Sequence, residues 1–468
     1  MKLYGIEFDF KNKPELDPQF IPMEAFRRSF LKTAEKKLVI AVERNDGLIS
    51  RYETKIHGTK EMFEADCFYA ERIMKFILWA KGGHKAYICG DEKIAGFIAG
   101  VYSLGGKRSF DYKFMTRIYE TPFEVVYLPI EKALMSNEKS RPAGRHLDGY
   151  RIGFDAGGSD RKVSAVAQGN VLFSEEVIWS PKTREDPEYH YREIVDAFKT
   201  AASKLPRVDA IGVSSAGVYL DNRTMVASLF MKVPEDKFNM HVKDIYIRAA
   251  KEIGNVPLVV ANDGDVTALA GAMSIDDVKV LGIAMGTSQA AGYVDEYGNI
   301  TGWLNELAFA PVDAGSEAAK DEWSGDTGCG VKYFSQDAVI KLAKFAGIKI
   351  DEGKQPSENL KIIQDMAANK YDTAMKIFES IGVYLGHSVA FYCNFYDIRH
   401  ILLLGRVMSG RGGNLIFETA NRVIADEYPE IFSSISIHLP DENSRRVGQS
   451  VAAASLPEIE SVNNNVKL

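Results

Sequence analysis

The sequence predicts an α/β protein with two similar lobes around a central cleft, and an α/β extension in front of them. Two observations support this prediction. A strand–turn–strand pattern, with a turn rich in glycine and hydroxyl residues, occurs twice, at 151–179 and at 280–302. After each occurrence, segments of helical and strand periodicity alternate, which is typical of α/β folds. A polar stretch with proline and glycine, at 137–149, precedes both rounds, and we interpret it as a linker.

The N-terminal extension is expected to span residues 1–140. It is predicted to contain a hairpin, an amphipathic helix and two further strands, at 38–56, 67–83, 85–89 and 123–128. The hairpin is indicated by Asn45-Asp46-Gly47 between two alternating runs. Because this order parallels the start of each later round, we predict a degenerate third copy of the lobe. An unrelated α/β domain is the alternative.

The two lobes are expected at 150–273 and at 274–456. In the first, the hairpin is followed by alternating helices and strands, at 188–204, 210–215, 241–253, 258–262 and from 263 onward. In the second, the hairpin is followed by three helices, a strand, a helix and a small-residue segment, at 337–347, 357–369, 371–394, 400–405, 412–427 and 447–456. A cleft between two such lobes would be a natural small-molecule site.

The composition argues against several classes of protein. Of the 468 residues, 46% are hydrophobic and 26% are charged, as in ordinary soluble globular proteins. The net charge of −7 argues against broad electrostatic binding to nucleic acid or to membranes. The N-terminus lacks the apolar core of a signal peptide, and no stretch approaches the roughly 20 apolar residues of a membrane span. Four dispersed cysteines are typical of reduced thiols, so a cytoplasmic protein is expected.

The turn of the first hairpin, in "GFDAGGSDRK", combines an acid, two glycines and a hydroxyl. The residues concerned are Asp155, Gly157, Gly158 and Ser159. Bare backbone N–H groups suit the approach of a phosphate, and a carboxylate beside them suits a hydrated cation. These are also ordinary turn residues, so this stretch alone favours a plain turn. The second hairpin repeats the chemistry at Gly286-Thr287-Ser288, which favours phosphate binding at both.

A third motif lies between the two turns, where the strand-like run "LVVAN" ends in Asn262 and Asp263. A helix is expected to begin directly afterwards. A carboxylate at this point could take a proton from a substrate hydroxyl. The alternative is that the pair only caps the helix, which would be the preferred interpretation of these two residues by themselves.

Taken in chain order, these motifs resemble the ROK family of sugar kinases and repressors, within the actin-like ATPase superfamily, over about residues 150–456. The resemblance rests on the two turns, on Asn262-Asp263-Gly264-Asp265, and on the segments "IGVSSAGV", "NELAF" and "LLLGRVMSGRGGN". It implies two actin-like (RNase H-like) lobes and an ATP- and Mg²⁺-dependent transfer of phosphate to a sugar.

The same resemblance implies a role for each matching residue. Asp263 would be the catalytic base, and Asp155 would position magnesium through water. Sugar contacts would come from Asn262, Glu306, Ser215 and Gly217. ATP and its phosphates would be bound by Asp155, Gly157, Gly158, Ser159, Gly286, Thr287, Ser288, Gly405, Gly412 and Gly413. The expected partner is a small-molecule sugar, without nucleic acid or membrane, and a homodimer is left open.

Several positions depart from the family's pattern. The family binds a structural zinc through one histidine and three cysteines, but here only Cys329 remains in "EWSGDTGC". Phe309, Glu322 and Ser324 replace the other three ligands, so no structural zinc is expected. Phe309 and Val331 also replace two usual sugar contacts, which predicts a substrate other than plain glucose.

The sequence therefore predicts an ATP-dependent sugar kinase. The alternative is a non-catalytic sugar- or nucleotide-sensing or regulatory protein on the same scaffold. Retention of both Asp155 and Asp263 favours the enzyme, because a sensor needs neither acid for proton transfer. The replacements at Phe309 and Val331, and Arg406 beside the nucleotide glycine, favour the alternative.

Overall fold

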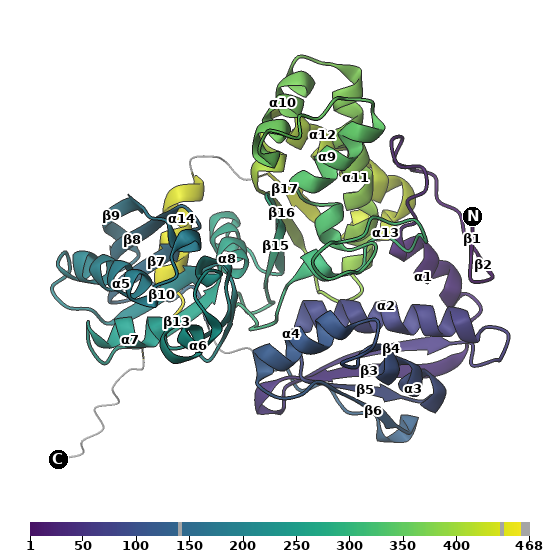
Figure 1. The fold of residues 1–468 in the computed structure, drawn as a ribbon, viewed down its shortest axis with the longest axis horizontal. Helices are drawn as coiled ribbons and strands as arrows, with labels where there is room; N and C mark the ends of the chain where they lie inside the picture. Colours follow the sequence, from purple (N-terminus) through teal and green to yellow (C-terminus); the bar gives the residue numbers. More distant parts are fainter. Residues whose placement is uncertain (139–142, 440–443, 460–468) are drawn as a thin grey trace. The chain divides into compact units, whose positions relative to one another are not determined.

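A computed structural model describes residues 1–138, 143–439 and 444–459 (Figure 1). It confirms the predicted α/β fold, with one main sheet in each lobe and another in the extension. Its contacts divide the chain into two compact units. Unit 1 comprises Met1–Lys139, Ile283–Ala291 and Trp303–Leu439, and unit 2 comprises Ser140–Gly282, Gly292–Gly302 and Pro440–Leu468. The extension thus forms one compact unit with most of the second lobe.

Unit 2 contains a five-stranded sheet in the order β13-β10-β7-β8-β9 (Figure 1). Its strands are β7 (Tyr150–Ala156), β8 (Asp160–Ala167), β9 (Asn170–Ile178), β10 (Ala210–Ser215) and β13 (Leu258–Asn262). The first three pair antiparallel, whereas β10 runs parallel to both β7 and β13. The carboxyl ends of β7, β10 and β13 therefore lie along one edge of the sheet, where ligands of open α/β sheets usually bind.

Several helices pack around this sheet. The main ones are α5 (Pro187–Ala202), α7 (Ile245–Lys251), α8 (Asp263–Ile275) and α14 (Ser444–Ala454). Smaller elements are β11 (Val218–Leu220), β12 (Arg223–Val226) and α6 (Glu235–Lys237). Apolar residues of the strands and helices, among them Phe154, Val213 and Phe198, form the buried core.

The position of α14 corrects the predicted boundary of the second lobe at 456. Two glycines of the first-lobe sheet admit this helix at close range. An ideal Cβ on Gly153 would lie 2.1 Å from the carbonyl oxygen of Ser450, and one on Gly212 would lie 1.7 Å from that of Ala453. Any side chain there would displace α14, so the C-terminal helix belongs to the first lobe. Its small-residue pattern predicts close packing but does not identify the sheet.

The second lobe has a four-stranded sheet in the order β15-β14-β16-β17. Its strands are β14 (Val280–Met285), β15 (Gln289–Val294), β16 (His400–Leu404) and β17 (Ser436–His438). Helices follow at α9 (Gln336–Phe345), α10 (Pro356–Ala368), α11 (Asp372–Tyr392), α12 (Gly410–Glu427) and α13 (Pro429–Phe432). The long helix α11 is buried along most of its length, in agreement with its apolar sequence.

The extension has its own sheet in the order β4-β3-β5-β6. Its strands are β3 (Lys36–Glu43), β4 (Ile49–Ile56), β5 (Lys85–Cys89) and β6 (Glu124–Leu128). Its helices are α1 (Met23–Leu31), α2 (Phe63–Lys81), α3 (Glu92–Val101) and α4 (Ser109–Tyr119), after two short strands, β1 (Lys2–Leu3) and β2 (Ile6–Glu7).

Strand direction shows that the extension is not a copy of the lobe, which corrects that prediction. The four predicted strands do share one sheet, but β5 runs antiparallel to β3. In the first lobe, the corresponding strand β10 runs parallel to β7. The reason is that two antiparallel strands precede α2, whereas three precede α5. The chain therefore leaves the extension's sheet at the opposite end of its strands, and the strand after the helix runs in the opposite direction.

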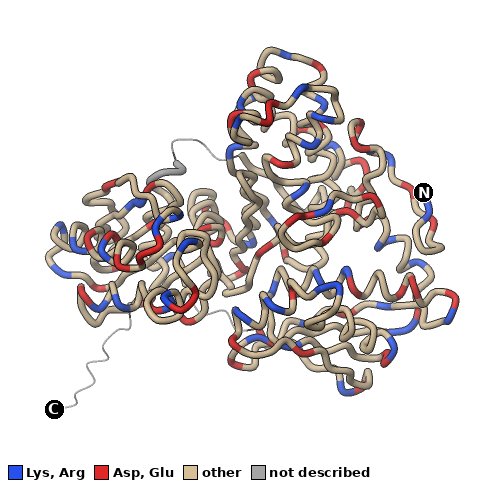
Figure 2. Tube along the Cα trace, in the orientation of Figure 1, with Lys and Arg blue, Asp and Glu red and all other residues tan. Residues whose placement is uncertain are grey.

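The surface chemistry of the chain is mixed. Basic and acidic residues alternate along the traces of both units (Figure 2). Within the described ranges, no helix combines the length and the apolar character needed to cross a membrane.

Candidate functional site

Asp155 lies near the end of β7, beside the parallel strand β10. The register pairs it with Ser214, whose hydroxyl donates a hydrogen bond of 2.8 Å to its Oδ1. Burial raises the pKa of the Asp155 carboxyl to about 6, although the Ser214 hydrogen bond opposes this shift. The charge of Asp263 also raises this pKa, so the two carboxyl groups interact electrostatically.

The turn after Asp155 is fixed by Trp179, the residue that follows β9. The indole N–H of Trp179 donates to the carbonyl oxygen of Gly157 at 2.8 Å, and its backbone N–H donates to that of Ser159 at 3.1 Å. Trp179 itself is buried. An ideal Cβ on Gly157 would lie 2.7 Å from the carbonyl oxygen of Asp160, so this tight turn requires glycine.

Lys182 is a candidate that the sequence analysis missed. It follows β9 in a short 3₁₀ turn, Pro181–Thr183, and its side chain is exposed. An ideal Cβ on Gly158 would lie 2.8 Å from its Nζ, and its charge lowers the pKa of Asp263. A cation beside a glycine turn suits phosphate binding. The sequence offered only "SPKTRED" after a strand, without a signal that this loop folds back on the turn.

Asn262 and Asp263 lie at the end of β13, where α8 begins. Asn262 is the N-cap of α8, because its Oδ1 accepts a 2.7 Å hydrogen bond from the Gly264 N–H. Its Nδ2 donates to the carbonyl oxygen of Gly217 at 2.7 Å. The capping interpretation of Asn262 is therefore confirmed, and its side chain also ties the β10–β11 connection to the site.

The electrostatics of Asp263 differ from the simple expectation for a helix N-terminus. Its Oδ1 also accepts a hydrogen bond from the Gly264 N–H, at 3.0 Å, which favours the ionised form. Burial is nevertheless the larger effect and raises the pKa of this carboxyl, while the charge of Lys182 partly offsets the shift. A carboxyl with a raised pKa is a better proton acceptor when it is ionised.

The segment after β10 contributes Ser215 and Gly217. The Ser215 hydroxyl is fully buried and accepts hydrogen bonds from Tyr219 at 2.7 Å and Tyr246 at 2.9 Å. Gly217 has a φ of +147°, and an ideal Cβ there would lie 2.5 Å from the carbonyl oxygen of Val226. Within unit 2, the structure thus gathers both acids, the glycine turn, Ser215 and Asn262 at the carboxyl edge of one sheet.

The second turn and the late glycines come together in unit 1. Gly286-Thr287-Ser288 connects β14 to β15, and the Gly286 N–H donates to the Ser288 carbonyl oxygen at 2.9 Å. Gly405 has a φ of +93°, and an ideal Cβ there would lie 2.3 Å from the carbonyl oxygen of Met285. Gly405 therefore packs directly against the start of the turn, and Arg406 follows in a 3₁₀ turn.

Gly412 and Gly413 lie in the first turn of α12, next to the backbone N–H groups at its start that have no helical partner. An ideal Cβ would lie 2.7 Å from the ring of Phe378 at Gly412, and 1.9 Å from the carbonyl oxygen of Met408 at Gly413. These glycines are required by packing as well as suited to a phosphate or nucleotide.

Glu306 lies in unit 1 against the C-terminus of α2. Its backbone N–H donates to the carbonyl oxygen of Trp79 at 3.0 Å. Phe309, one turn later, is buried with its ring 4.4 Å from that of Trp79. The sequence could not indicate these contacts, because Trp79 belongs to the extension and lies more than 200 positions away.

The donor groups of the chain limit which metal ions it could hold. No group of three or more His, Cys, Asp or Glu side chains is arranged to hold a metal ion in the described part of the chain. Magnesium bound with a nucleotide needs only one or two protein carboxylates, because water and phosphate supply the other ligands. The half-buried Asp155 beside the glycine turn fits this requirement, since a cation there would favour its ionised form.

Comparisons with known proteins agree with this architecture. The ROK family model matches residues 151–432. Among solved structures, the ROK hexokinase from Thermus thermophilus has 16% identity and a TM-score of 0.51, covering 65% of this chain and 97% of its own. A ROK family transcriptional regulator, a homologue of E. coli MLC protein, has 18% identity and a TM-score of 0.50, covering 66% and 79%.

At these identities, the two solved structures show a shared fold only. No curated protein sequence matches this chain. The family model, however, spans more than half of the 468 residues, and its match begins within β7, the strand that carries Asp155. This chain therefore belongs to the ROK family.

Proposed function

We propose that this protein is an ATP-dependent kinase that phosphorylates a hydroxyl group of a sugar or sugar derivative. The observation that supports this most is the pair of acids in unit 2. Asp155 and Asp263 lie at the same edge of one sheet and interact electrostatically. Asp155 directly precedes the glycine turn, and Lys182 lies beside that turn with its charge acting on Asp263. This combination suits phosphoryl transfer, in which catalysis is mostly positioning and electrostatic stabilisation.

In this proposal, Asp263 accepts the proton of the sugar hydroxyl as its oxygen attacks the γ-phosphorus of ATP. The bond from that phosphorus to the bridging oxygen breaks, and the products are a sugar phosphate and ADP. The N–H groups of the glycine turn and the ammonium of Lys182 would stabilise charge on the phosphate oxygens. Magnesium, held through water by Asp155, would neutralise further phosphate charge.

The proposed substrate class rests on Phe309, the aromatic residue near Glu306. Phe309 is buried among aromatic rings at a position where the family usually has a hydrogen-bonding sugar contact. A sugar hydroxyl buried there without a partner would cost about 1–3 kcal/mol. We therefore propose a sugar derivative with an apolar or differently placed group, rather than plain glucose.

The four cysteines are free, which supports a cytoplasmic location.

The test is ATP consumption against a panel of hexoses, amino sugars and their acylated derivatives, with the wild type and Asp263→Asn. Asparagine keeps the size of the side chain but cannot accept the proton. We expect kcat to fall by about 10²–10⁴-fold while sugar binding changes little. Asp196→Asn, on an exposed face of α5, is the matched control and should behave as the wild type.

Near wild-type turnover in Asp263→Asn would contradict the mechanism. Tight binding of a sugar without turnover by the wild type would instead favour the second candidate, a regulatory or sensing protein. The observation that favours this second candidate is the replacement of a usual sugar contact by the buried Phe309.

A further inference from the structure

The C-terminus of α2 is capped by a segment of the second lobe. A helix leaves its last carbonyl groups without helical partners. Here the carbonyl oxygens of Lys81, Ala80 and Trp79 accept hydrogen bonds from three successive N–H groups. These come from Leu304 at 3.4 Å, Asn305 at 3.0 Å and Glu306 at 3.0 Å. The backbone before the candidate sugar-binding side chain of Glu306 is therefore fixed by the extension.

Trp79 links this cap to a buried group of charges. Its carbonyl oxygen accepts from Glu306, its ring packs against Phe309, and its indole N–H donates to Asp111 of α4 at 2.5 Å. Asp111 in turn accepts a hydrogen bond of 2.8 Å from Lys75, which has no exposed surface. A continuous path of contacts thus runs from Glu306 into the interior of the extension.

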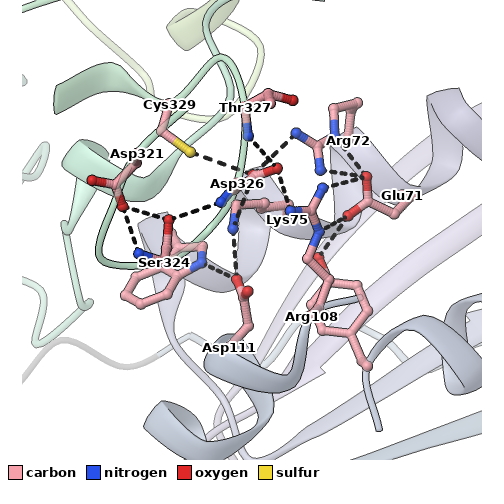
Figure 3. Close-up of polar contacts among 12 residues, drawn as sticks. Glu71, Arg72, Lys75, Arg108, Asp111, Asp321, Ser324, Asp326, Thr327 and Cys329 are labelled. Atoms are coloured by element: carbon pink, nitrogen blue, oxygen red, sulfur yellow. Dashed lines mark hydrogen bonds and ion pairs between the residues drawn. The ribbon is translucent and has the colours of Figure 1, made fainter. Parts of the chain in front are cut away.

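Asp326 is at the centre of this buried group (Figure 3). It belongs to the loop 321–329 of the second lobe, and it forms ion pairs with Arg72 at 3.2 Å, with Lys75 at 3.2 Å and with Arg108. It also accepts hydrogen bonds from within its own loop, from the Thr327 N–H at 2.8 Å and the Cys329 thiol at 3.3 Å.

The group is balanced in charge. Three bases, Arg72, Lys75 and Arg108, face three acids, Glu71, Asp111 and Asp326, and all six side chains are buried. Burial alone would raise the pKa of Asp326, but Arg72 and Lys75 lower it to about 2. Removing one charge from such a group leaves another buried and unpaired, whereas removing an oppositely charged pair does not.

We propose that Lys75 and Asp326 are positioning residues, through which the extension holds the Glu306 segment and the loop 321–329 in the geometry that binds the sugar. This inference rests on the proposed function for its substrate, but the contacts that carry it lie wholly within unit 1. The extension is then a built-in part of the sugar-binding half of the second lobe, rather than an appended domain.

The experiment compares Lys75→Met, Asp326→Asn and the double variant with the wild type. Each single change leaves an uncompensated buried charge, while the double change leaves two acids facing two bases. The control is Lys36→Met, which removes the distant Lys36–Asp91 ion pair of the same unit. The first readout is hydrogen exchange of the backbone amides 304–306 and 326–329, measured without substrate.

We expect these amides to exchange at least about tenfold faster in both single variants, because their local opening becomes easier, and to recover in the double variant. In kinetics, the KM for the sugar should rise by about 10–100-fold in the single variants, as expected for a displaced binding group. The KM for ATP and kcat should change by less than about twofold, since only sugar binding is affected.

Unchanged exchange at 304–306 in both single variants would overturn the proposal, and so would a lack of recovery in the double variant. Faster exchange without a change in the sugar KM would overturn the positioning role. If a single variant does not fold, recovery of wild-type exchange and KM by the double variant still decides the question. If the wild type phosphorylates no sugar, the proposed function fails separately, and the exchange comparison decides whether the extension fixes the Glu306 segment.

Discussion

Asp155 and Asp263 are held in surroundings that oppose their ionisation, although the proposed chemistry requires them ionised. Burial raises the pKa of both, to about 6 for Asp155, and the charge of Asp263 adds to the shift at Asp155. A structural role would favour apolar residues at these positions. Two partly buried acids that weaken the fold near neutral pH are instead typical of a functional site.

This cost can be measured at Asp155. In the unfolded chain its pKa would be about 3.9, so the folded state holds the proton to higher pH. The free energy of unfolding therefore falls as the pH rises from about 4 to about 6, and stays lower above that. Asp155→Asn removes the loss while its Oδ1 can still accept from Ser214. We expect it to stabilise unit 2 by about 1–3 kcal/mol at pH 7.5 and by no more than about 0.5 kcal/mol at pH 4.

The measurement is urea denaturation of both proteins at the two pH values, followed by a probe in unit 2 such as the fluorescence of Trp179. The comparison between pH values serves as the internal control, because a packing effect would persist at pH 4. Destabilisation by Asp155→Asn at pH 7.5 would show that a favourable interaction of the carboxylate outweighs its burial.

Lys182 allows a separate test of the glycine turn. Lys182→Met keeps the aliphatic part of the side chain and removes the ammonium beside Gly158. If this ammonium contacts a phosphate of ATP, the KM for ATP should rise by about tenfold, the usual effect of losing one charge-assisted contact. The sugar KM should stay constant. Lys237→Met, in the exposed helix α6, is the control, and equal kinetics in the two variants would exclude a role for Lys182.

At the scale of elements, α2 shows why part of the site lies beyond sequence-based prediction. The pattern at 67–83 predicts an amphipathic helix, yet the helix is buried almost all round, including Glu71, Arg72 and Lys75. Charged residues on a helix ordinarily indicate a solvated face. Glu71 and Arg72 pair with each other, but their further partners and those of Lys75 are distant. These partners are Arg108 and Asp111, more than 30 positions later, and Asp326 in the second lobe, so no local pattern could reveal that the whole group is buried.

The elements whose signals are local were predicted well. The hairpins at 38–56 and 280–302, the glycine turns and the strand before Asp263 are fixed by alternation and turn chemistry within a few residues, and the structure confirms them. The predicted hairpin at 151–179 is instead three antiparallel strands, β7, β8 and β9, because a second turn at Gln168-Gly169 divides its second half. The predictions that were wrong concern features that depend on contacts between residues distant in the sequence. The direction of β5 depends on where the chain enters α2, and the placement of α14 depends on two glycines in another part of the chain.

The loop 321–329 gives a prediction about metal content. The family fixes this loop with zinc, but here the remaining thiol, Cys329, donates a hydrogen bond to Asp326, which is surrounded by three bases. The carboxylate of Asp326 is already paired with these bases, so the charge group anchors the loop without a metal ion. We therefore expect purified protein to contain no stoichiometric zinc, and a chelator to leave its Tm unchanged.

Elemental analysis with and without prior incubation in EDTA provides the measurement, and a zinc-containing ROK protein treated in parallel provides the control. About one zinc per chain, the stoichiometry of a closed structural site, would contradict the prediction.

For the whole molecule, the division into units differs from the division into lobes and extension. The extension shares buried charges with the second lobe, whereas α14, near the end of the chain, completes the core of the first. Cooperative unfolding follows shared buried contacts rather than the order of the sequence. The extension should therefore unfold together with the second lobe and not as an independent domain.

The division into two units predicts the number of thermal unfolding transitions. We expect two transitions in calorimetry, one for each unit, rather than three for an extension and two lobes. Asp326→Asn should lower only the transition of unit 1, because it leaves a base unpaired in the buried charge group. Asp155→Asn at pH 7.5 should raise only the transition of unit 2.

Hydrogen exchange during heating assigns each transition to a unit. Amides of β3 and α11 should open together, and so should those of β7 and α14. Opening of β3 at a lower temperature than α11 would mean that the extension is an autonomous domain, and a shift of both transitions by either variant would mean that the chain unfolds as one unit.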